Sequence, residues 1–415
     1  MSRQWFVVLH RYVGLVIAGF LVLAGITGTL LVWYLELDRA INPSLYQISS
    51  EYSDQAPLTS LQLREIVDKQ YPNNPVDYVG FNSDSDHAHV FYLGWAQDAE
   101  TGAFIEPENN EIFIHPHTGE ILGERQWGSI SQGVKNLMPF IYKLHYSLAL
   151  GTIGTYTFGI IALLWTIDCF VGAYLTFPRR RRNKNKGSSW FTRWKPAWKV
   201  RWNKGTYKLN FDFHVASGLW LWAMLFVFAW SSVGFNLGEV YNPVMQAIFS
   251  HHEQFQRQAP PDKEALSSLL TWQEALEVGQ THAQQLAEKE QFLLHDDLTL
   301  YLNRYDHVFT YGASSDLNVG DRQSSVQISF DAGSGELLHQ YRNYAQGGLG
   351  DTVTEWLIAF HTADVWGLPF RIFVTILGLV IAMLSVTGVI IWWRKFKARR
   401  RAAAKKARAA ASLKS

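Results

Sequence analysis

Cysteine is nearly absent from this sequence, and that absence limits how the protein is stabilised. The only one, Cys169, lies in an apolar stretch and has no second cysteine to pair with. A disulfide-stapled secreted fold is therefore excluded. The chain also carries no glycine-rich nucleotide-binding motif before its basic C-terminal tail, so we expect no cytoplasmic flavin or nicotinamide domain.

Acidic residues are missing from two segments that are rich in Lys and Arg. The segment from Pro178 to Phe211 has 12 basic residues and no acid, and the tail from Arg394 has 10 basic residues and no acid. All acidic residues except Asp168 and Asp212 lie in or beside two long loops. Because Lys and Arg are retained on the cytoplasmic side of a membrane, both basic segments are predicted to be cytoplasmic.

Long apolar runs are present, although the mean hydropathy of the whole chain is near zero. Four runs reach the length of about 20 residues that a helix needs to cross a bilayer. The first has no signal-peptide cleavage site, so we expect it to remain in the protein. The runs are Val13 to Leu35, Gly151 to Phe177, Val215 to Leu237 and Ile372 to Trp393.

The predicted fold is a membrane bundle of four transmembrane helices with two periplasmic α+β domains. The natural setting is a bacterial inner membrane, with the lipid bilayer around the helices, both termini in the cytoplasm and no nucleic acid as a partner. The predicted segments are helix 1 in 1–35, periplasmic domain 1 in 36–144, helix 2 in 145–177, a basic cytoplasmic loop in 178–211, helix 3 in 212–237, periplasmic domain 2 in 238–360, helix 4 in 361–393 and a basic cytoplasmic tail in 394–415.

Two spacings recur in both halves of the chain and predict an internal duplication. A glycine, a histidine 26 residues later and another glycine 27 residues after that occur twice. They are Gly119, His145 and Gly172 in the first half, and Gly335, His361 and Gly388 in the second. The helices that begin the halves also agree, because His10 and His214 are each followed by a glycine four residues later.

The two long loops show the same order of expected elements. An amphipathic helix comes first, at Ser60 to Gln70 and at Trp272 to Lys289. A strand-turn-strand segment follows, at Glu111 to Leu122 and at Val326 to Leu338, with glycines suited to a turn that needs positive φ. Each loop is therefore expected to be a small α+β unit.

Four histidines occupy equivalent places near the membrane edges. His10 and His214 lie at the cytoplasmic ends of helices 1 and 3, and His145 and His361 lie towards the periplasmic ends of helices 2 and 4. Imidazoles from facing helices are well suited to hold the iron of a b-type haem from both sides. A histidine at a helix end is often only an interfacial or capping residue, but recurrence in the same register favours two haems, paired by depth.

Other polar residues have weaker patterns. The pairs His115/His117 and His251/His252 suggest a periplasmic metal site, although a turn and a loop flank explain them better. Asp168, inside an apolar helix, predicts either a proton-linked role or an interhelical hydrogen bond.

Three basic residues near the histidines leave two interpretations open. They either pair with haem propionates or anchor to lipid headgroups. These residues are Arg11, Lys143 and Arg371.

The chain resembles the PepSY-associated transmembrane family. The resemblance rests on His10-Arg-Tyr-Val-Gly14, on Gly25-Ile-Thr-Gly28, on the two Gly-Glu hairpins and on the segments that begin at His145 and His361. It covers nearly the whole chain. It implies four helices, two periplasmic PepSY-like domains, haem held by histidines and reduction of a ferric complex in the periplasm.

Three functions follow from these predictions. The first is a haem-dependent reductase of ferric siderophores, with His10, His214, His145 and His361 as axial ligands, no acid-base residue, and quinol or a cytoplasmic flavoprotein as electron donor. The second keeps the haems but passes electrons to a periplasmic partner protein. The third is a non-redox PepSY module that binds a periplasmic peptidase.

Overall fold

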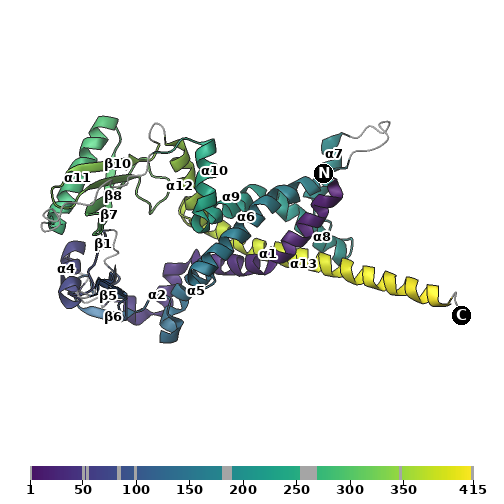
Figure 1. Cartoon of the computed structure of the whole chain (residues 1–415), viewed down its shortest axis with the longest axis horizontal. Coiled ribbons are helices and arrows are strands. Elements are labelled where there is room, and N and C mark those ends of the chain that lie inside the picture. The colour runs from purple at the N-terminus through teal and green to yellow at the C-terminus, as the bar shows by residue number, and fades with distance from the viewer. Residues whose placement is uncertain are drawn as a thin grey trace.

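The computed structural model is elongated, with apolar helices in the middle, all strands at one end and both chain termini at the other (Figure 1). We call these the sheet end and the terminal end. The structure describes residues 2–48, 52, 56–81, 86–97, 101–179, 189–252, 269–344 and 348–412. Residues 180–188 of the predicted basic loop and 253–268 of the second long loop therefore lie outside the described residues.

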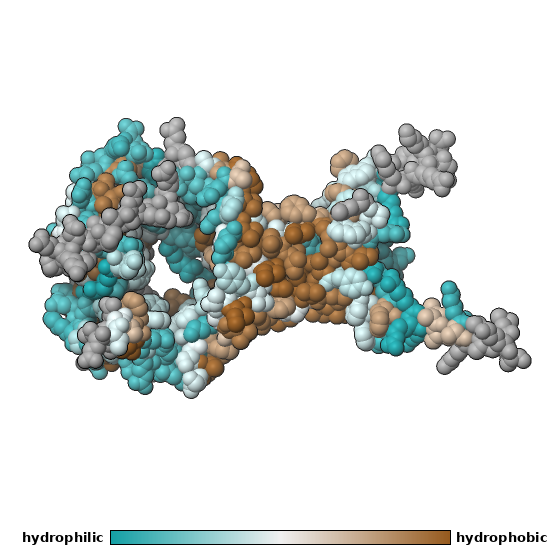
Figure 2. Space-filling model, in the orientation of Figure 1, coloured by the Kyte–Doolittle hydropathy of each residue, from teal (hydrophilic) through white to brown (hydrophobic). Residues whose placement is uncertain are grey.

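Three helices are long and apolar enough to cross a membrane: α1 (Arg3–Leu31), α6 (Gly151–Thr176) and α13 (Gly367–Ser412). A fourth span results if α8 (Thr206–Trp220) and α9 (Trp222–Asn236), bent by 71°, count as one. On the face shown in Figure 2, an apolar band covers this part of the molecule, with hydrophilic surface on either side. The described chain thus has the surface of a membrane protein.

Two helix boundaries differ from those that hydropathy indicates. Helix α8 begins at Thr206, inside the predicted basic loop, because Lys and other polar residues can continue a helix beyond the apolar layer. Helix α13 runs on through the predicted tail to Ser412, since Ala, Lys and Arg are strong helix formers. Hydropathy marks where a chain enters lipid and does not mark where a helix ends.

Two small residues let α1 and α13 approach closely. A Cβ placed on Gly25 would lie 2.5 Å from the carbonyl oxygen of Gly378, and a Cβ on Gly378 would lie 2.7 Å from that of Gly25. Small residues are the usual means of bringing membrane helices together. This contact joins the first spanning helix to the last.

A short helix precedes each of two spanning helices. Helix α5 (Leu137–Ser147) ends in a turn with positive φ at Leu148, Ala149 and Gly151 before α6 begins. Helix α12 (Leu349–Thr362) ends in the same way before α13. His145 and His361 therefore lie on the short helices α5 and α12. The sequence predicts them at the start of the spanning helices, in segments 145–177 and 361–393. Residues with left-handed backbone angles end a helix. Because the residues before and after each of these turns are apolar, the hydropathy of the sequence does not reveal the break.

The predicted helices and hairpins at the sheet end are confirmed. Helix α4 (Ser60–Gln70) and helix α11 (Trp272–Glu290) each begin with a capping box. Strand β5 (Glu111–Ile114) pairs with β6 (Ile121–Arg125), and β9 (Val326–Asp331) pairs with β10 (Leu337–Arg342). The turn glycines, Gly119 and Gly335, have φ of 72° and 73°.

Strands from both long loops belong to one sheet. The prediction that each loop forms a domain of its own therefore needs correction. A five-stranded sheet has the order β1-β7-β8-β9-β10. One of its two edge strands, β1, comes from the first loop, and the other four strands come from the second. A three-stranded sheet, β2-β5-β6, and a two-stranded one, β3-β4, belong to the first loop alone. The remaining strands are β1 (Tyr78–Gly80), β2 (His89–Tyr92), β3 (Ala96–Gln97), β4 (Phe104–Ile105), β7 (Leu294–Asn303) and β8 (Val308–Ser315).

Side chains reinforce this junction between the loops. Asp77, beside β1, accepts a hydrogen bond from Arg304 at 2.7 Å. The guanidinium of Arg64 lies 4.0 Å from the ring centre of Trp272. A three-residue strand is too short to be recognised in a sequence, and it becomes a strand because the edge of β7 offers unpaired backbone groups.

Candidate functional site: two pairs of facing histidines

At the terminal end, the structure brings together His10 of α1 and His214 of α8. Their ring centres are 6.2 Å apart and the ring planes are inclined by 55°. The two residues are 204 positions apart in the chain, so only the packing of the helices makes them neighbours. They form the pair that was predicted from the depth of the histidines in the membrane.

At the sheet end, His145 of α5 and His361 of α12 form a second pair. Their ring centres are 6.3 Å apart, with 71° between the planes. All four candidate histidines thus occur in two pairs of nearly equal spacing. In each pair, one histidine comes from each half of the chain.

The spacing within each pair fits a metal ion held between two imidazoles. A metal–nitrogen bond is about 2 Å long and the ring centre lies about 1.2 Å beyond the nitrogen, so two imidazoles on opposite sides of one metal have centres about 6.4 Å apart. The observed 6.2 and 6.3 Å agree with this value.

Hydroxyl groups hold the pair at the sheet end. Nδ1 of His145 is 2.9 Å from the Thr27 hydroxyl, and Nδ1 of His361 is 2.7 Å from the Ser231 hydroxyl. Both hydroxyls donate their own proton to a carbonyl of their helix, at 2.8 Å in each case. With the hydroxyl proton on that carbonyl, each hydroxyl accepts from Nδ1–H, and this tautomer leaves the lone pair of each imidazole on Nε2.

A carboxylate and a carbonyl hold the pair at the terminal end. Asp168 accepts from Nδ1 of His10 at 2.8 Å, and the Leu384 carbonyl accepts from Nδ1 of His214 at 3.1 Å, beside the Thr387 hydroxyl. Asp168 therefore makes an interhelical hydrogen bond, one of the two roles predicted for it. In all four histidines Nδ1 is engaged, and Nε2 has no hydrogen-bond partner among the described residues, as in metal-binding histidines.

Glycines lie against the edges of three of the four rings. A Cβ at Gly28 would lie 3.1 Å from Cε1 of His145, and Cβ atoms at Gly172 and Gly388 would lie 3.5 and 3.3 Å from Cε1 of His10 and His214. By contrast, Cβ atoms at Gly14 and Gly218, one turn from the terminal-end histidines, would meet nothing within 4 Å. The structure thus leaves open space beside the helix turn that follows each terminal-end histidine.

Aromatic side chains enclose His361. The Phe228 ring is stacked on it, with centres 4.7 Å apart, and the Phe235 ring meets it edge-on at 5.2 Å. These contacts restrict the imidazole to one orientation. They also exclude water from one side of the sheet-end pair.

An apolar layer separates the two pairs. Thr27, which contacts the sheet-end pair, is 17 residues from His10 on the same helix, which corresponds to about 25 Å along the helix axis. The cluster between them includes Ile17, Leu225 and Leu377, with Phe20 and Trp165 packed against it. The two pairs are thus positioned near opposite faces of a hydrophobic layer about as thick as the core of a bilayer.

Two of the three basic residues near the histidines contact other side chains of the protein. Arg371 forms an ion pair with Glu36 at 2.6 Å and lies over the ring of Trp33. The ammonium of Lys143 is 5.2 Å from the ring centre of Trp127. Arg371 and Lys143 thus have partners within the protein.

The other histidine pairs have structural roles in the described chain. Nδ1 of His115 accepts the backbone N–H of His117, which stabilises the turn between β5 and β6. His251 binds a backbone carbonyl of its own segment at 3.1 Å, and His252 contacts Asp351 at 2.9 Å. Among the described residues, no group of three or more His, Cys, Asp or Glu could hold a metal ion.

Three hydroxyl residues were missed at the sequence level, namely Thr27, Ser231 and Thr387. Two of them have a recognisable spacing, because Thr27 follows His10 by 17 residues and Ser231 follows His214 by 17. The spacing that relates His10 to His214 in the predicted repeat therefore extends to the hydroxyl residues Thr27 and Ser231. Thr387 has no such counterpart, because Val171 occupies the equivalent position of the first half.

These features define a class of membrane protein in which apolar helices bring half-buried histidines together and an α+β region lies at one end. A family model described as the PepSY-associated TM region matches residues 7–395. The chain therefore belongs to this family. No match was found among curated proteins.

Proposed function

We propose that this chain is a di-haem membrane protein that transfers electrons across the bacterial inner membrane and reduces a ferric siderophore in the periplasm. The carrying observation is the geometry of the two histidine pairs. Both have the centre-to-centre spacing of a bis-imidazole metal site, and all four Nδ1 atoms are engaged, which leaves Nε2 of each ring available to a metal.

The orientation in the membrane follows from charge. The described parts of the two segments rich in Lys and Arg, residues 178–179, 189–211 and 394–412, lie at the terminal end, which we assign to the cytoplasm. The sheet end then lies in the periplasm. With α8 and α9 counted as one span, four helices cross the membrane.

Each group of residues has a distinct task in this function. His10 and His214 would hold one b-type haem, and His145 and His361 would hold the other. Haem supplies a one-electron Fe(III)/Fe(II) couple, which protein side chains in an apolar layer lack. Asp168, Thr27, Ser231 and the Leu384 carbonyl fix the tautomer and direction of the imidazoles, while the apolar cluster between the pairs keeps water out.

The proposed acceptor is a ferric siderophore because iron held by hard oxygen ligands is released on reduction. Such ligands prefer the smaller and harder ferric ion to the ferrous ion. No side chain has to act as acid, base or nucleophile. The electron donor is quinol or a cytoplasmic flavoprotein.

The experiment that tests haem binding is the visible spectrum and haem-to-protein ratio of the purified chain and of four variants. We expect about two b-type haems per chain. His10→Ala and His214→Ala should lose the same haem, and His145→Ala and His361→Ala the other. His295→Ala, at an exposed position of β7 outside both pairs, is the matched control. A colourless wild-type protein from haem-replete cells would favour the peptidase-binding module instead.

Reduction is tested separately, in vesicles that enclose an electron donor and have a ferric chelate and a ferrous-specific dye outside. The wild type should colour the dye, and the haem-deficient variants should not. If haem is present but no ferric chelate is reduced, the acceptor is a periplasmic protein, and the second function replaces the first.

A further inference from the structure

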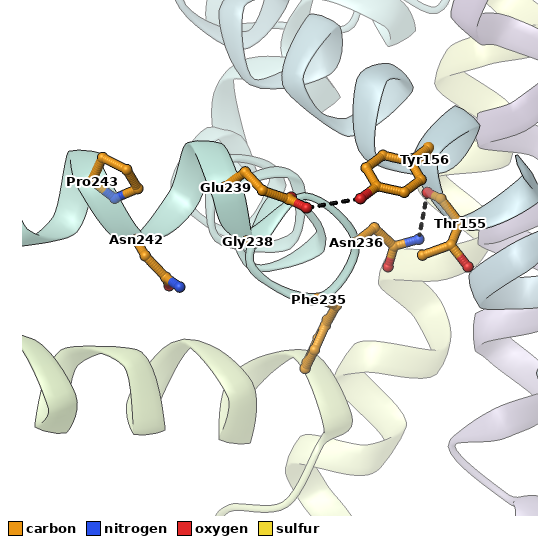
Figure 3. A pocket seen from close by; sticks show the side chains of 8 residues that line it. All are labelled: Thr155, Tyr156, Phe235, Asn236, Gly238, Glu239, Asn242 and Pro243. Carbon is orange, nitrogen blue, oxygen red and sulfur yellow. Dashed lines mark hydrogen bonds between the residues drawn. The ribbon is translucent and has the colours of Figure 1, made fainter. Parts of the chain in front are cut away.

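A hollow of about 570 Å³ lies next to the sheet-end histidine pair. It is bounded by the start of α6, the end of α9 and the start of α10 (Gly238–Ile248) (Figure 3). Its volume is within the range of sites that bind small molecules. The side chains that line it include those of Tyr156, Phe235, Asn236, Glu239 and Asn242.

Phe235 connects this hollow with the candidate redox site. Phe235 lines the hollow, and the residue is 48% exposed. Its ring meets His361 edge-on at 5.2 Å, and Figure 3 shows it pointing towards α12. A molecule in the hollow is therefore separated from the sheet-end pair by one aromatic side chain.

Most of the other side chains that line the hollow are polar, and one of them, Glu239, carries negative charge. Glu239 is exposed and accepts a hydrogen bond from the Tyr156 hydroxyl at 2.8 Å. Asn242 is exposed beside it, one turn further along α10. Among the described residues, no Lys, Arg or His lines the hollow. An anionic ligand would thus be repelled, and a neutral or cationic ligand with hydrogen-bonding groups would be accepted.

We propose that this hollow is where an uncharged or cationic ferric chelate binds to be reduced. This inference rests on the proposed function, which supplies one electron from ferrous haem at the sheet-end pair. One electron would pass from the ferrous haem that His145 and His361 would hold, whose iron would become Fe(III), and the chelated Fe(III) would become Fe(II) without a bond to the protein. The exposed carboxylate at the entrance selects against anionic chelates, such as those of catecholates.

Binding is tested without electron transfer by using gallium(III), which has the charge and size of ferric iron but is not reduced. The probe is gallium tris(acetohydroxamate), a neutral complex, in equilibrium dialysis against the purified holoprotein. Gly238→Leu fills the hollow, and the new side chain has room, since a Cβ there meets only the Asn242 amide at 3.8 Å. We expect binding to weaken about tenfold or more. Gln246→Leu, exposed on the same helix outside the hollow, should change nothing.

Charge selection is tested by the KM for two ferric chelates, neutral iron tris(acetohydroxamate) and anionic iron–EDTA. The variant Glu239→Lys should lower the KM for iron–EDTA about fivefold and leave that for the neutral chelate nearly unchanged. Equal effects on both chelates, or unchanged gallium binding in Gly238→Leu, would overturn the proposal. If Gly238→Leu instead slows reduction of the haems by quinol, the hollow belongs to the donor, which also overturns it.

These outcomes are distinct from a failure of the proposed function. If the protein contains no haem, the function fails, whereas gallium binding still reports on the hollow. If the haems are present and ferric chelates are reduced by both Gly238→Leu and wild type with equal KM, the function stands and only the location is wrong.

Discussion

The two histidine pairs have the same spacing but are held by different chemistry. At the terminal end a carboxylate, Asp168, accepts from His10, whereas at the sheet end both acceptors are neutral hydroxyls, those of Thr27 and Ser231. An anionic acceptor makes an imidazole a stronger electron donor and so favours ferric over ferrous iron. We therefore expect the lower potential at the terminal end, which directs electrons towards the sheet end.

The pairs also differ in what supports them. His10 and His214 lie on helices of the membrane bundle, whereas His145 and His361 lie on short helices that lead into it from the sheet end. The sheet-end pair should therefore depend on the folding of the outer region, and the terminal-end pair should not. Four predictions test this contrast, beginning with the largest effect.

The variant Gly28→Ile should eliminate haem at the sheet end alone. A Cβ at Gly28 lies 3.1 Å from the His145 ring, so a branched side chain displaces the imidazole. We expect the haem-to-protein ratio to fall by about half, with the remaining spectrum that of the terminal-end site. Gly19→Ile, whose Cβ meets nothing within 4 Å, is the matched control. Loss of both haems would contradict independent sites.

The variant Arg125→Ala should destabilise the outer region by about 3–5 kcal/mol. Arg125 is fully buried and pairs with Asp38 at 2.7 Å and Glu111 at 2.6 Å, so its removal leaves two buried carboxylates uncompensated. Hydrogen exchange of the sheet-end strands measures the change. Arg304→Ala breaks a more exposed ion pair and should cost at most about 1 kcal/mol.

The same variant tests the dependence of the sheet-end pair on the outer region. Arg125 also donates to the Lys135 carbonyl, two residues before α5 begins, so it helps to position the helix that carries His145. Haem should dissociate from the sheet-end site at a lower temperature than from the terminal-end site. Equal dissociation temperatures would show that the bundle alone supports both pairs.

The variant Asp168→Asn should raise the midpoint potential of one haem by about 50 mV, because a hydrogen bond to a charged group is lost. Thr27→Val, which removes a neutral acceptor at the other pair, should shift the other potential by about half as much. Spectroelectrochemical titration resolves the two. A shift of both potentials in Asp168→Asn, or of neither, would refute the assignment of the lower potential to the carboxylate.

The smallest effect concerns Glu355 on α12. Burial, and then the nearby Asp351, raises the pKa of Glu355 to about 7. The folded protein thus keeps a proton that the unfolded chain, with a pKa near 4.5, releases. Its stabilising contribution is complete below pH 4.5 and disappears as the pH rises through 7. Between about pH 5 and pH 8 the outer region should lose about 1–2 kcal/mol of stability.

The control for this pH dependence is Glu355→Gln, which should flatten the profile measured by hydrogen exchange of α12. Glu277→Gln, at an exposed position of α11, should leave the profile as it is. A wild-type stability that is already flat over this pH interval would mean that Glu355 is ionised in the folded protein.

Local elements were predictable where the sequence contains their full cause. The helix at Ser60–Gln70 begins at a capping box that lies within four consecutive residues, and the turn at Gly119 depends on one glycine. Strand β1 was not predictable, because its hydrogen-bond partners are residues 299–301 of the other loop. The turns after His145 and His361 were missed because hydropathy does not register a change of backbone direction.

The sequence by itself determined which segments are apolar enough to enter lipid, which segments are basic and therefore predicted to be cytoplasmic, and which four histidines are candidates for metal binding. Those properties depend on composition, charge and spacing along one chain. Only the tertiary structure decided which rings face each other, which hydroxyls and carboxylate hold them, and where the hollow beside Phe235 lies. These contacts join residues more than 70 positions apart, so they depend on how each helix is rotated and bent against its neighbours, which no short stretch of sequence specifies.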